Sequence, residues 1–169
     1  VVGLMERVIG SLVNPFISDE LSGDVEDPDQ DFQKGLHVRL DKIGQLNQSI
    51  LDYLVKISNE ELNENQSREI FTLVSVANYL DSIRSAVEMR YSNLMGKKET
   101  LEGAFSEEGQ NDLAAYHLKM IKQLSRIGKF FKKYDPKKAE KIVAKGEKYK
   151  GLEEKYRLAH INRASAGKT

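Results

Sequence analysis

Four long stretches of this chain carry apolar residues at intervals of three and four, the spacing that places them on one face of a helix. The first two stretches carry Phe32, Leu36, Leu40, Ile43, Leu46 or Asn47, Ile50, Leu54 and Ile57, and then Leu73, Val76, Leu80, Ile83, Val87, Tyr91 and Leu94. The other two carry Leu113, Tyr116, Met120, Leu124, Ile127 and Phe131, and then Ala139, Ile142, Gly146, Tyr149, Leu152 or Glu153, Tyr156 and His160. Each apolar face must be covered, so the pattern predicts packed helices, with Leu80 and Ile83 in the core.

The segments between these stretches contain helix-start and turn signals. Asn59 or Asn65 is the expected cap of the second helix, and Gly96 and Gly103 bracket a polar segment that predicts a turn. Short connections of this kind favour an all-α, up-and-down antiparallel bundle of about four long helices, with a short amphipathic helix at the N-terminus.

The last two helices have the clearest start signals. Ser106 is a suitable cap, because Glu107 and Glu108 follow it in the first turn, where the helix dipole favours negative charge. Asp135 and Pro136 predict the start of the next helix, with Asp as the cap and Pro at the first helical position. The short joint between these helices predicts that they are antiparallel neighbours.

The N-terminal part of the chain divides into an apolar and an acidic segment. Residues 1–16 have apolar side chains at helical spacing and Pro15 as a stop, and they are too few to span a bilayer. We expect an amphipathic helix that packs on the bundle, or else the cytosolic end of a membrane helix or a helix that lies at the membrane interface. Residues 17–31 carry seven acids and predict an exposed linker. The helical bundle is then expected over residues 32–166.

The residue types that most enzymes need are missing or scattered. The chain has no Cys, and its three histidines, His37, His117 and His160, are far apart in sequence. Disulfides and thiolate chemistry are therefore excluded, and the histidine spacing is not that of a zinc site. No nucleophile, base and orienting group are grouped together, so we expect neither enzyme activity nor a cofactor.

Charge is segregated along the chain although the formal net charge is zero. Between Lys119 and Lys150 the sequence has twelve Lys or Arg residues and three acids. Ordinary solvated helix faces explain such a segment, and so does an anionic membrane surface or a nucleic acid. Because no nucleic-acid recognition motif accompanies the lysines, we expect no nucleic acid and prefer the membrane surface of the two partners.

One set of polar residues on the second predicted helix has the spacing of a binding site. Asn78, Asp81, Ser85 and Glu88 follow one another at intervals of three, four and three, and so share a face. Oxygen ligands at this spacing can hold a hard cation when another helix adds to them. A polar seam, in which Asp81 pairs with Arg84, Arg68 or a lysine, also explains the pattern and is the interpretation that we prefer.

At these residues the sequence resembles the PhoU family, whose helices carry a pattern close to Asn-Asp-Leu-Glu-Arg-Ile-Gly-Asp. Asn78, Leu80 and Ile83 match that pattern, and Asp81 replaces its first acid. Two further stretches are similar to the family's helix ends: Phe105–Gly109, with Ser106 in a Phe-Ser turn, and His160–Arg163, which resembles His-Leu-x-Arg. The resemblance covers about residues 31–166.

The family pattern bears on whether this chain binds a metal cluster. The acids of the family pattern contribute to metal clusters, which would make Asp81, Ser85 and Glu88 the candidate ligands. Ser85, however, stands where the second acid belongs, and a neutral hydroxyl is a weaker ligand than a carboxylate. We therefore expect no tight metal cluster, with Asp81 in a polar contact instead.

The resemblance also implies a role in phosphate transport. PhoU domains occur as free regulators of phosphate uptake and as the cytosolic tail of bacterial sodium-dependent phosphate transporters. Because the chain begins at Val1 and has about one bundle of long helices, we expect a tail that follows a membrane domain. Its expected partner is that membrane domain or another transport protein. A stand-alone adaptor that contacts a transporter ATPase or a sensor kinase is the alternative, and a homo-oligomer stays open.

Overall fold

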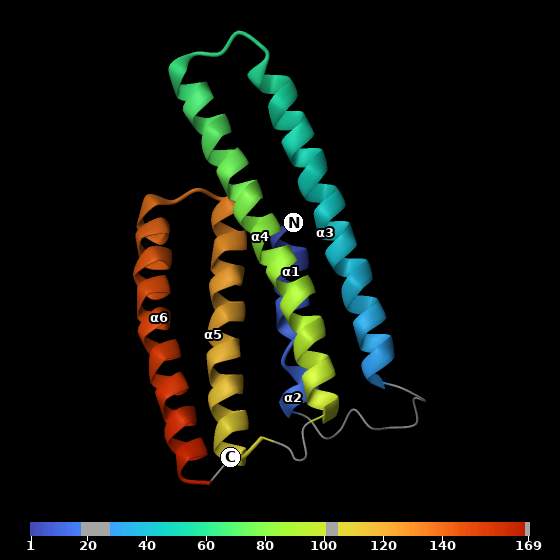
Figure 1. The fold of residues 1–169 in the computed structure, drawn as a ribbon. Coiled ribbons are helices and arrows are strands. Elements are labelled where there is room, and N and C mark those ends of the chain that lie inside the picture. Colours follow the sequence, from blue (N-terminus) through green and yellow to red (C-terminus); the bar gives the residue numbers. More distant parts are fainter. Residues whose placement is uncertain (18–27, 101–104, 168–169) are drawn as a thin grey trace. The chain divides into compact units, whose positions relative to one another are not determined.

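The computed structural model describes residues 1–17, 28–100 and 105–167, and within these ranges it contains helices and no strand (Figure 1). The helices are α1 (Val2–Ser11), α2 (Asn14–Ile17), α3 (Pro28–Ser58), α4 (Glu64–Thr100), α5 (Glu107–Lys132) and α6 (Pro136–Ser165). The prediction of an all-α helical bundle with four long helices and a short N-terminal helix is confirmed. None of the helices in the described ranges has the length and apolarity that crossing a membrane requires.

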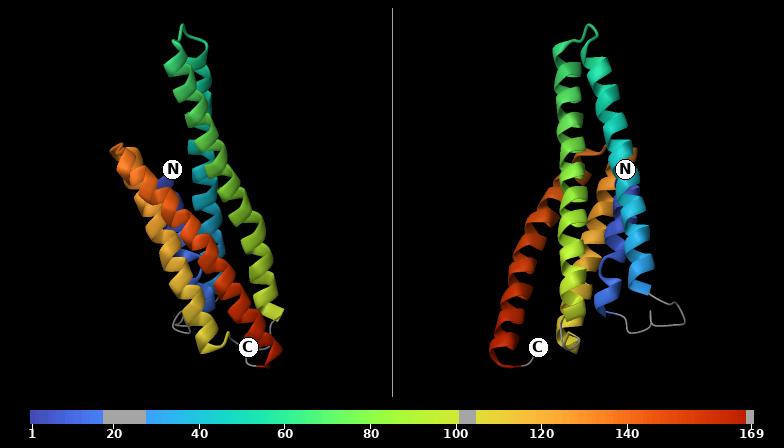
Figure 2. Two further views of the ribbon diagram at one scale, coloured as in Figure 1. Left: turned by 90° about the vertical axis from the view of Figure 1, so that its left-hand side faces the viewer. Right: turned by 45° about the vertical axis from the view of Figure 1, so that its right-hand side comes forward.

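The chain divides into two compact units, each built around a pair of long helices. The first unit contains α3 and α4, and the second contains α2, α5 and α6 with most of α1. Figure 2 shows from two further sides that the long helices of each pair run antiparallel. The expected boundaries at 1–16, 17–31 and 32–166 stay a prediction. Helix α3 begins at Pro28, inside the expected linker, and residues 18–27 lie outside the described part of the chain.

The first apolar stripe is mostly where the sequence places it, although Ile50 is exposed. Its buried members on α3 are Leu36, Leu40, Ile43, Asn47 and Leu54. Of the two alternatives at the centre of the stripe, the polar Asn47 is buried and Leu46 is only partly buried. The ring of Phe32 packs against the ring of Tyr91 on α4, with their centroids 6.0 Å apart. These contacts join the two helices of the first unit.

The prediction of the second apolar stripe is partly wrong. Leu73, Ile83 and Leu94 are exposed, whereas Ala77, Tyr91 and Met95 are the buried residues of α4. Helix α4 has apolar residues around most of its circumference, so spacing alone does not select the buried face. The structure therefore corrects the predicted burial of Ile83, and Leu80 is only partly buried.

The start of α4 also differs from the prediction. Asn63, and neither Asn59 nor Asn65, caps the helix: its side chain accepts a hydrogen bond from the Gln66 backbone N–H at 3.0 Å. The Gln66 side chain accepts in return from the Asn63 backbone N–H, also at 3.0 Å. This reciprocal arrangement is a capping box, which satisfies two backbone donors that the first helical turn leaves without partners.

The prediction of a turn that begins at Gly96 is wrong. The helix continues through Gly96 to Thr100, and Gly96 does not have a positive φ. A glycine inside a helix costs about 1 kcal/mol relative to alanine, which neighbouring packing can outweigh. Met95, directly before it, is almost fully buried. Gly103, the other boundary of the predicted turn, lies outside the described residues.

The N-terminal segment forms two helices instead of one. Helix α1 ends at Ser11, and Pro15 lies inside the short α2 instead of ending the first helix. Proline has no N–H, so Pro15 could not donate to the Ser11 carbonyl if the first helix continued through it. Met5 and Val8 are fully buried, as the amphipathic pattern of this segment predicts.

Shortening a buried side chain of α3 should destabilise the protein far more than the same change on the exposed side of α4. Leu40→Ala is expected to lower the free energy of unfolding by about 2–5 kcal/mol, because Leu40 is fully buried. Leu94→Ala is the matched control: half of Leu94 is exposed, and we expect a loss within about 0.5 kcal/mol. Urea denaturation followed by circular dichroism measures both. Equal losses would show that the buried face is assigned wrongly.

Candidate functional site

Helices α5 and α6 form an antiparallel hairpin whose helix starts follow the predicted caps. The Ser106 hydroxyl accepts a hydrogen bond from the Gly109 backbone N–H at 3.3 Å, at the start of α5. The Asp135 carboxylate accepts from the backbone N–H groups of Lys137 and Lys138 at 3.0 and 3.4 Å, at the start of α6. Both capping predictions are confirmed, as is the prediction that these helices are neighbours.

Polar and aromatic contacts join the two helices along their length. The Gln123 side chain donates to the Ile142 carbonyl at 2.7 Å. Nη1 of Arg126 donates to the Tyr149 hydroxyl at 3.2 Å. We call the contacts between α5 and α6 the α5–α6 seam. It includes these two hydrogen bonds and two contacts nearer the open end of the hairpin, between Tyr116 and Tyr156 and between Asp112 and Arg163. They are important because α5 has no buried residue and Tyr149 is the only buried residue of α6.

Tyr149 is the buried centre of this seam, and positive charge surrounds its hydroxyl. Burial by itself raises the pKa of the Tyr149 phenol. The hydrogen bond from Arg126 and the positive charges of Arg126, Lys145 and Lys119 have the opposite effect and leave the pKa below its ordinary value. The phenol therefore accepts a charged hydrogen bond where it is buried, which links α6 to α5 near the middle of the hairpin.

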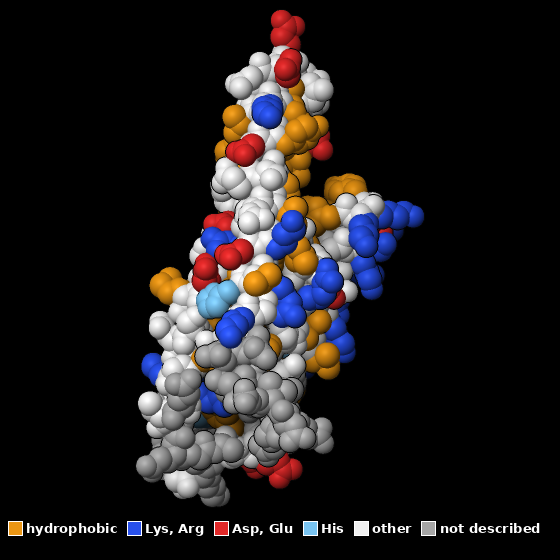
Figure 3. Space-filling model, turned by 90° about the vertical axis from the view of Figure 1, so that its right-hand side faces the viewer, with side chains coloured by type: hydrophobic (Ala, Val, Ile, Leu, Met, Phe, Trp, Pro, Cys, Tyr) orange, Lys and Arg blue, Asp and Glu red, His pale blue; other side chains and the backbone are white. Residues whose placement is uncertain are grey.

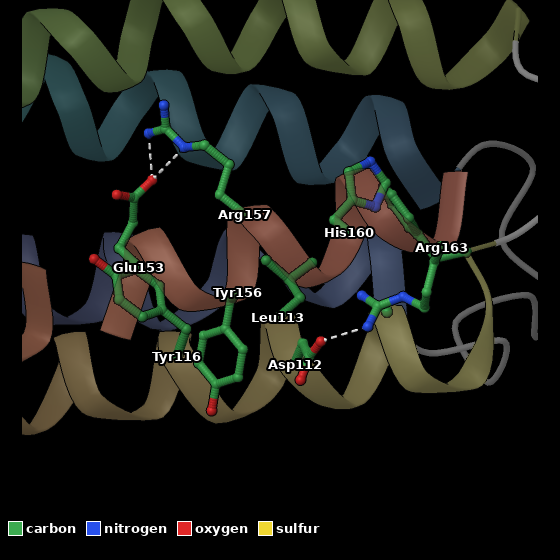
Figure 4. Close-up of a pocket in the computed structure, with 10 residues that line it drawn as sticks. Asp112, Leu113, Tyr116, Glu153, Tyr156, Arg157, His160 and Arg163 are labelled. Atoms are coloured by element: carbon green, nitrogen blue, oxygen red, sulfur yellow. Dashed lines mark hydrogen bonds and ion pairs between the residues drawn. The ribbon is translucent and has the colours of Figure 1, made fainter. Parts of the chain in front are cut away.

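The open end of the hairpin contains a pocket of about 360 Å³. It is lined by Phe105, Gly109, Asp112, Leu113, Tyr116, Glu153, Tyr156, Arg157, His160 and Arg163. Figure 4 shows the lining side chains of α5 facing those of α6 across it. The rings of Tyr116 and Tyr156 meet edge to face, with their centroids 6.3 Å apart, and form the third contact of the seam.

An ion pair closes the seam at the end of the pocket. Nη1 of Arg163 on α6 donates to a carboxylate oxygen of Asp112 on α5 at 2.9 Å, and a Glu108 oxygen lies 4.0 Å away. The Arg163 side chain is only 13% exposed, so water screens this pair less than a surface pair. We call the Arg163–Asp112 pair the clasp, because it joins residues 51 positions apart in sequence.

The other charges of the pocket are also engaged. Nε of Arg157 donates to Glu153 at 3.0 Å within α6. Burial, and then the negative charge of Glu153, raises the pKa of Tyr116. Of the guanidinium nitrogens lining the pocket, Arg163 Nε is buried without a hydrogen-bond partner. Both arginines therefore already neutralise carboxylates, and the pocket presents a mostly apolar, aromatic surface with little uncompensated charge.

The structure brings together three of the residues that the sequence analysis selected. Ser106, His160 and Arg163 lie at the same end of the hairpin, and a Cβ added to Gly109 would lie 3.2 Å from Ser106 Oγ and 3.9 Å from Arg163 Nη2. His160 is exposed. Asp112 is the partner of Arg163, and no sequence motif signals an acid at that position.

Asn78 and Asp81 belong to the other unit and form a different arrangement. Asn78 is exposed, whereas Asp81, Ser85 and Glu88 all contact Arg84 on the same helix. The Arg84 Nε and Nη1 atoms donate to Asp81 and Glu88 at 2.7 Å each, and Nη2 lies 3.2 Å from the Ser85 hydroxyl. The expected polar contact of Asp81 is therefore made, and Arg84 is its partner.

The guanidinium group of Arg84 occupies the position among Asp81, Ser85 and Glu88 that a bound cation would need. The hydrogen bond to Asp81 is the largest cause that raises the pKa of Arg84 above its ordinary value, so Arg84 stays charged. Across the interhelix contact, a Cβ added to Gly44 on α3 would lie 3.4 Å from Arg84 Nε, so glycine makes room for the arginine. In the described ranges, no group of three His, Cys, Asp or Glu side chains is placed to hold a metal.

The chain is similar in sequence to curated proteins whose name refers to phosphate export. A Salmonella typhimurium protein named "Putative inorganic phosphate export protein YjbB" is 25% identical over 131 residues, which are 78% of this chain and 24% of the relative. The protein of the same name from Escherichia coli strain K12 is 26% identical over the same shares. This chain therefore spans about a quarter of the length of these relatives. No family model matches the chain, and no solved structure does.

The Arg84 network generates a prediction about metal content. We expect protein purified without chelator or affinity tag to hold no stoichiometric iron, zinc or manganese, because a positive guanidinium already neutralises Asp81 and Glu88. Elemental analysis of the wild type and of Asp81→Ala tests this. Bound metal that disappears in the variant would contradict the prediction and assign Asp81 a ligand role.

The clasp generates a prediction about stability. In a double-mutant cycle of Asp112→Asn and Arg163→Gln, we expect a coupling free energy of about 1–2 kcal/mol, because hydrogen bonds to charged groups are strong where water is partly excluded. The matched control is Glu153→Gln with Arg157→Gln, a more exposed pair within one helix, for which about 0.5 kcal/mol or less is expected. Equal coupling in the two cycles would remove the special role of the clasp.

Proposed function

We propose that this chain is a PhoU-like helical domain that regulates phosphate transport. The observation that carries the proposal is the similarity to the two YjbB proteins, whose name refers to phosphate export and which this chain matches over 78% of its length. The resemblance of the Phe105–Ser106 turn and the His160–Arg163 ending to the PhoU family supports the same conclusion. Of the residues in these two stretches, Phe105, His160 and Arg163 line the pocket at the open end of the α5–α6 hairpin.

The proposed setting is the cytosolic part of a sodium-dependent phosphate symporter. The relatives are about four times as long as the matched segment, which leaves room for a membrane domain in a protein of that length. In this setting the domain lies at the cytoplasmic face of the membrane, and its partner is the membrane domain of the same protein or another transport protein. It reports phosphate status and does not carry phosphate itself.

The proposed role is regulatory and not enzymatic. The two arginines of the pocket and the one among the candidate metal ligands all engage carboxylates of their own unit. Charges that are already compensated are poorly suited to activating a substrate. The clasp is then the proposed point of control, because opening it would separate the start of α5 from the end of α6.

Radioactive phosphate flux in cells tests this proposal. The complete natural protein that contains this chain is compared with the same protein lacking residues 28–167, in a strain without other phosphate transporters. We expect deletion to abolish the difference in flux between phosphate-rich and phosphate-starved cells while transport itself continues. Arg163→Gln should have the same effect in weaker form, and Arg157→Gln, on the exposed pair, should leave regulation intact.

Two outcomes would contradict the proposal. If deletion leaves the response to phosphate starvation unchanged, the chain is not the regulatory part. If the natural protein moves no phosphate by itself and changes flux only when a separate transporter ATPase is present, the symporter setting is wrong and the stand-alone adaptor is correct.

A further inference from the structure

The connection between α5 and α6 concentrates lysines at one end of the hairpin. We call residues 129–141 the hairpin tip. It contains six lysines and two acids, in the order Lys129, Lys132, Lys133, Asp135, Lys137, Lys138, Glu140 and Lys141. All six lysines are exposed. The tip therefore has a strong local excess of positive charge in a chain whose formal net charge is zero.

Acids of the protein do not cancel this charge. Asp135 caps α6 by accepting hydrogen bonds from the backbone of Lys137 and Lys138, and its carboxylate lies 3.5 Å from Lys138 Nζ. Of the tip lysines in the described structure, Lys138 alone lies within ion-pair distance of an acid. The remaining five lysines are available to an anionic partner.

An aromatic cluster lies among these lysines. The ring of Phe130 contacts the rings of Phe131 and Tyr134, with centroid distances of 6.0 and 5.4 Å. Phe131 is 47% exposed and Tyr134 is 75% exposed, so the cluster lies at the surface of the protein. Figure 3 shows Lys and Arg side chains gathered around hydrophobic ones at this end of the hairpin.

We propose that the hairpin tip docks on an anionic lipid surface. Negatively charged headgroups complement the uncancelled lysines, and a polybasic segment gains binding energy for each lysine near such a surface. Aromatic rings favour the boundary between headgroups and acyl chains, where Phe131 and Tyr134 would lie, and lysine stems can cover apolar surface while their ammonium groups reach the headgroups. An acidic protein surface would match the lysines but offers no general place for two exposed rings.

This inference goes beyond the proposed function and does not depend on it. It rests on the charge and exposure of the tip, whereas the role in phosphate transport rests on the relatives and on the open end of the hairpin. Vesicle binding can therefore fail while regulation of phosphate flux holds, and the reverse is equally observable.

Sedimentation of the 169-residue chain with lipid vesicles tests the proposal. We expect binding to vesicles of phosphatidylcholine with about one third phosphatidylglycerol, little binding to phosphatidylcholine alone, and loss of binding as salt rises and screens the charges. Lys132→Gln, Lys133→Gln and Lys137→Gln combined should weaken binding on the order of a hundredfold, since each lysine near an anionic surface contributes about fivefold.

The matched control removes the same charge elsewhere. Lys42→Gln, Lys56→Gln and Lys97→Gln combined change exposed lysines of α3 and α4, and should alter binding by no more than about twofold. Phe131→Ser with Tyr134→Ser should also weaken binding, although it leaves the charge unchanged. No binding to anionic vesicles at low salt, equal effects of the two lysine triples, or equal binding to neutral vesicles would each overturn the proposal.

Discussion

The α5–α6 hairpin depends on side-chain bridges between its two helices, because it lacks a deep apolar core. Gln123 with Ile142, Arg126 with Tyr149, and Tyr116 with Tyr156 follow one another along the seam, and Asp112 with Arg163 ends it. Each bridge uses a donor or ring whose partner lies on the opposite helix, so the set holds one register. The clasp and the pocket follow from that register, since both need residues of α5 and α6 at matching heights.

The sequence predicts this hairpin well and the first unit less well. Ser106 and Asp135 are recognisable caps because they combine a side-chain acceptor with a favourable first turn, and the structure has both. On α4 the apolar residues are too numerous for their spacing to select one face. The cap at Asn63 depends on its reciprocal bond with Gln66, a pair that a search for single asparagines overlooks.

Most of what the sequence could not reveal about the site concerns which side chains contact each other in the folded protein. The His160–Arg163 ending is visible as a family resemblance, but its partner Asp112 is 51 residues from Arg163 and carries no motif. Similarly, the spacing of Asp81, Ser85 and Glu88 is typical of a cation site and of an internal salt bridge alike. Only the position of Arg84, between the two acids and against Gly44, distinguishes these cases.

The distribution of charge separates the parts of α5 and α6 that hold the hairpin from the part that is free to bind. At the open end, Arg157 and Arg163 pair with carboxylates of the same hairpin, so their positive charges are neutralised within the protein. At the tip, five of six lysines have no such acid within reach among the residues that the structure describes, although holding like charges together is unfavourable in a folded protein. That cost falls when an anionic surface lies nearby. The same hairpin therefore combines a compensated end, suited to fixing its register, with an uncompensated end suited to an external partner.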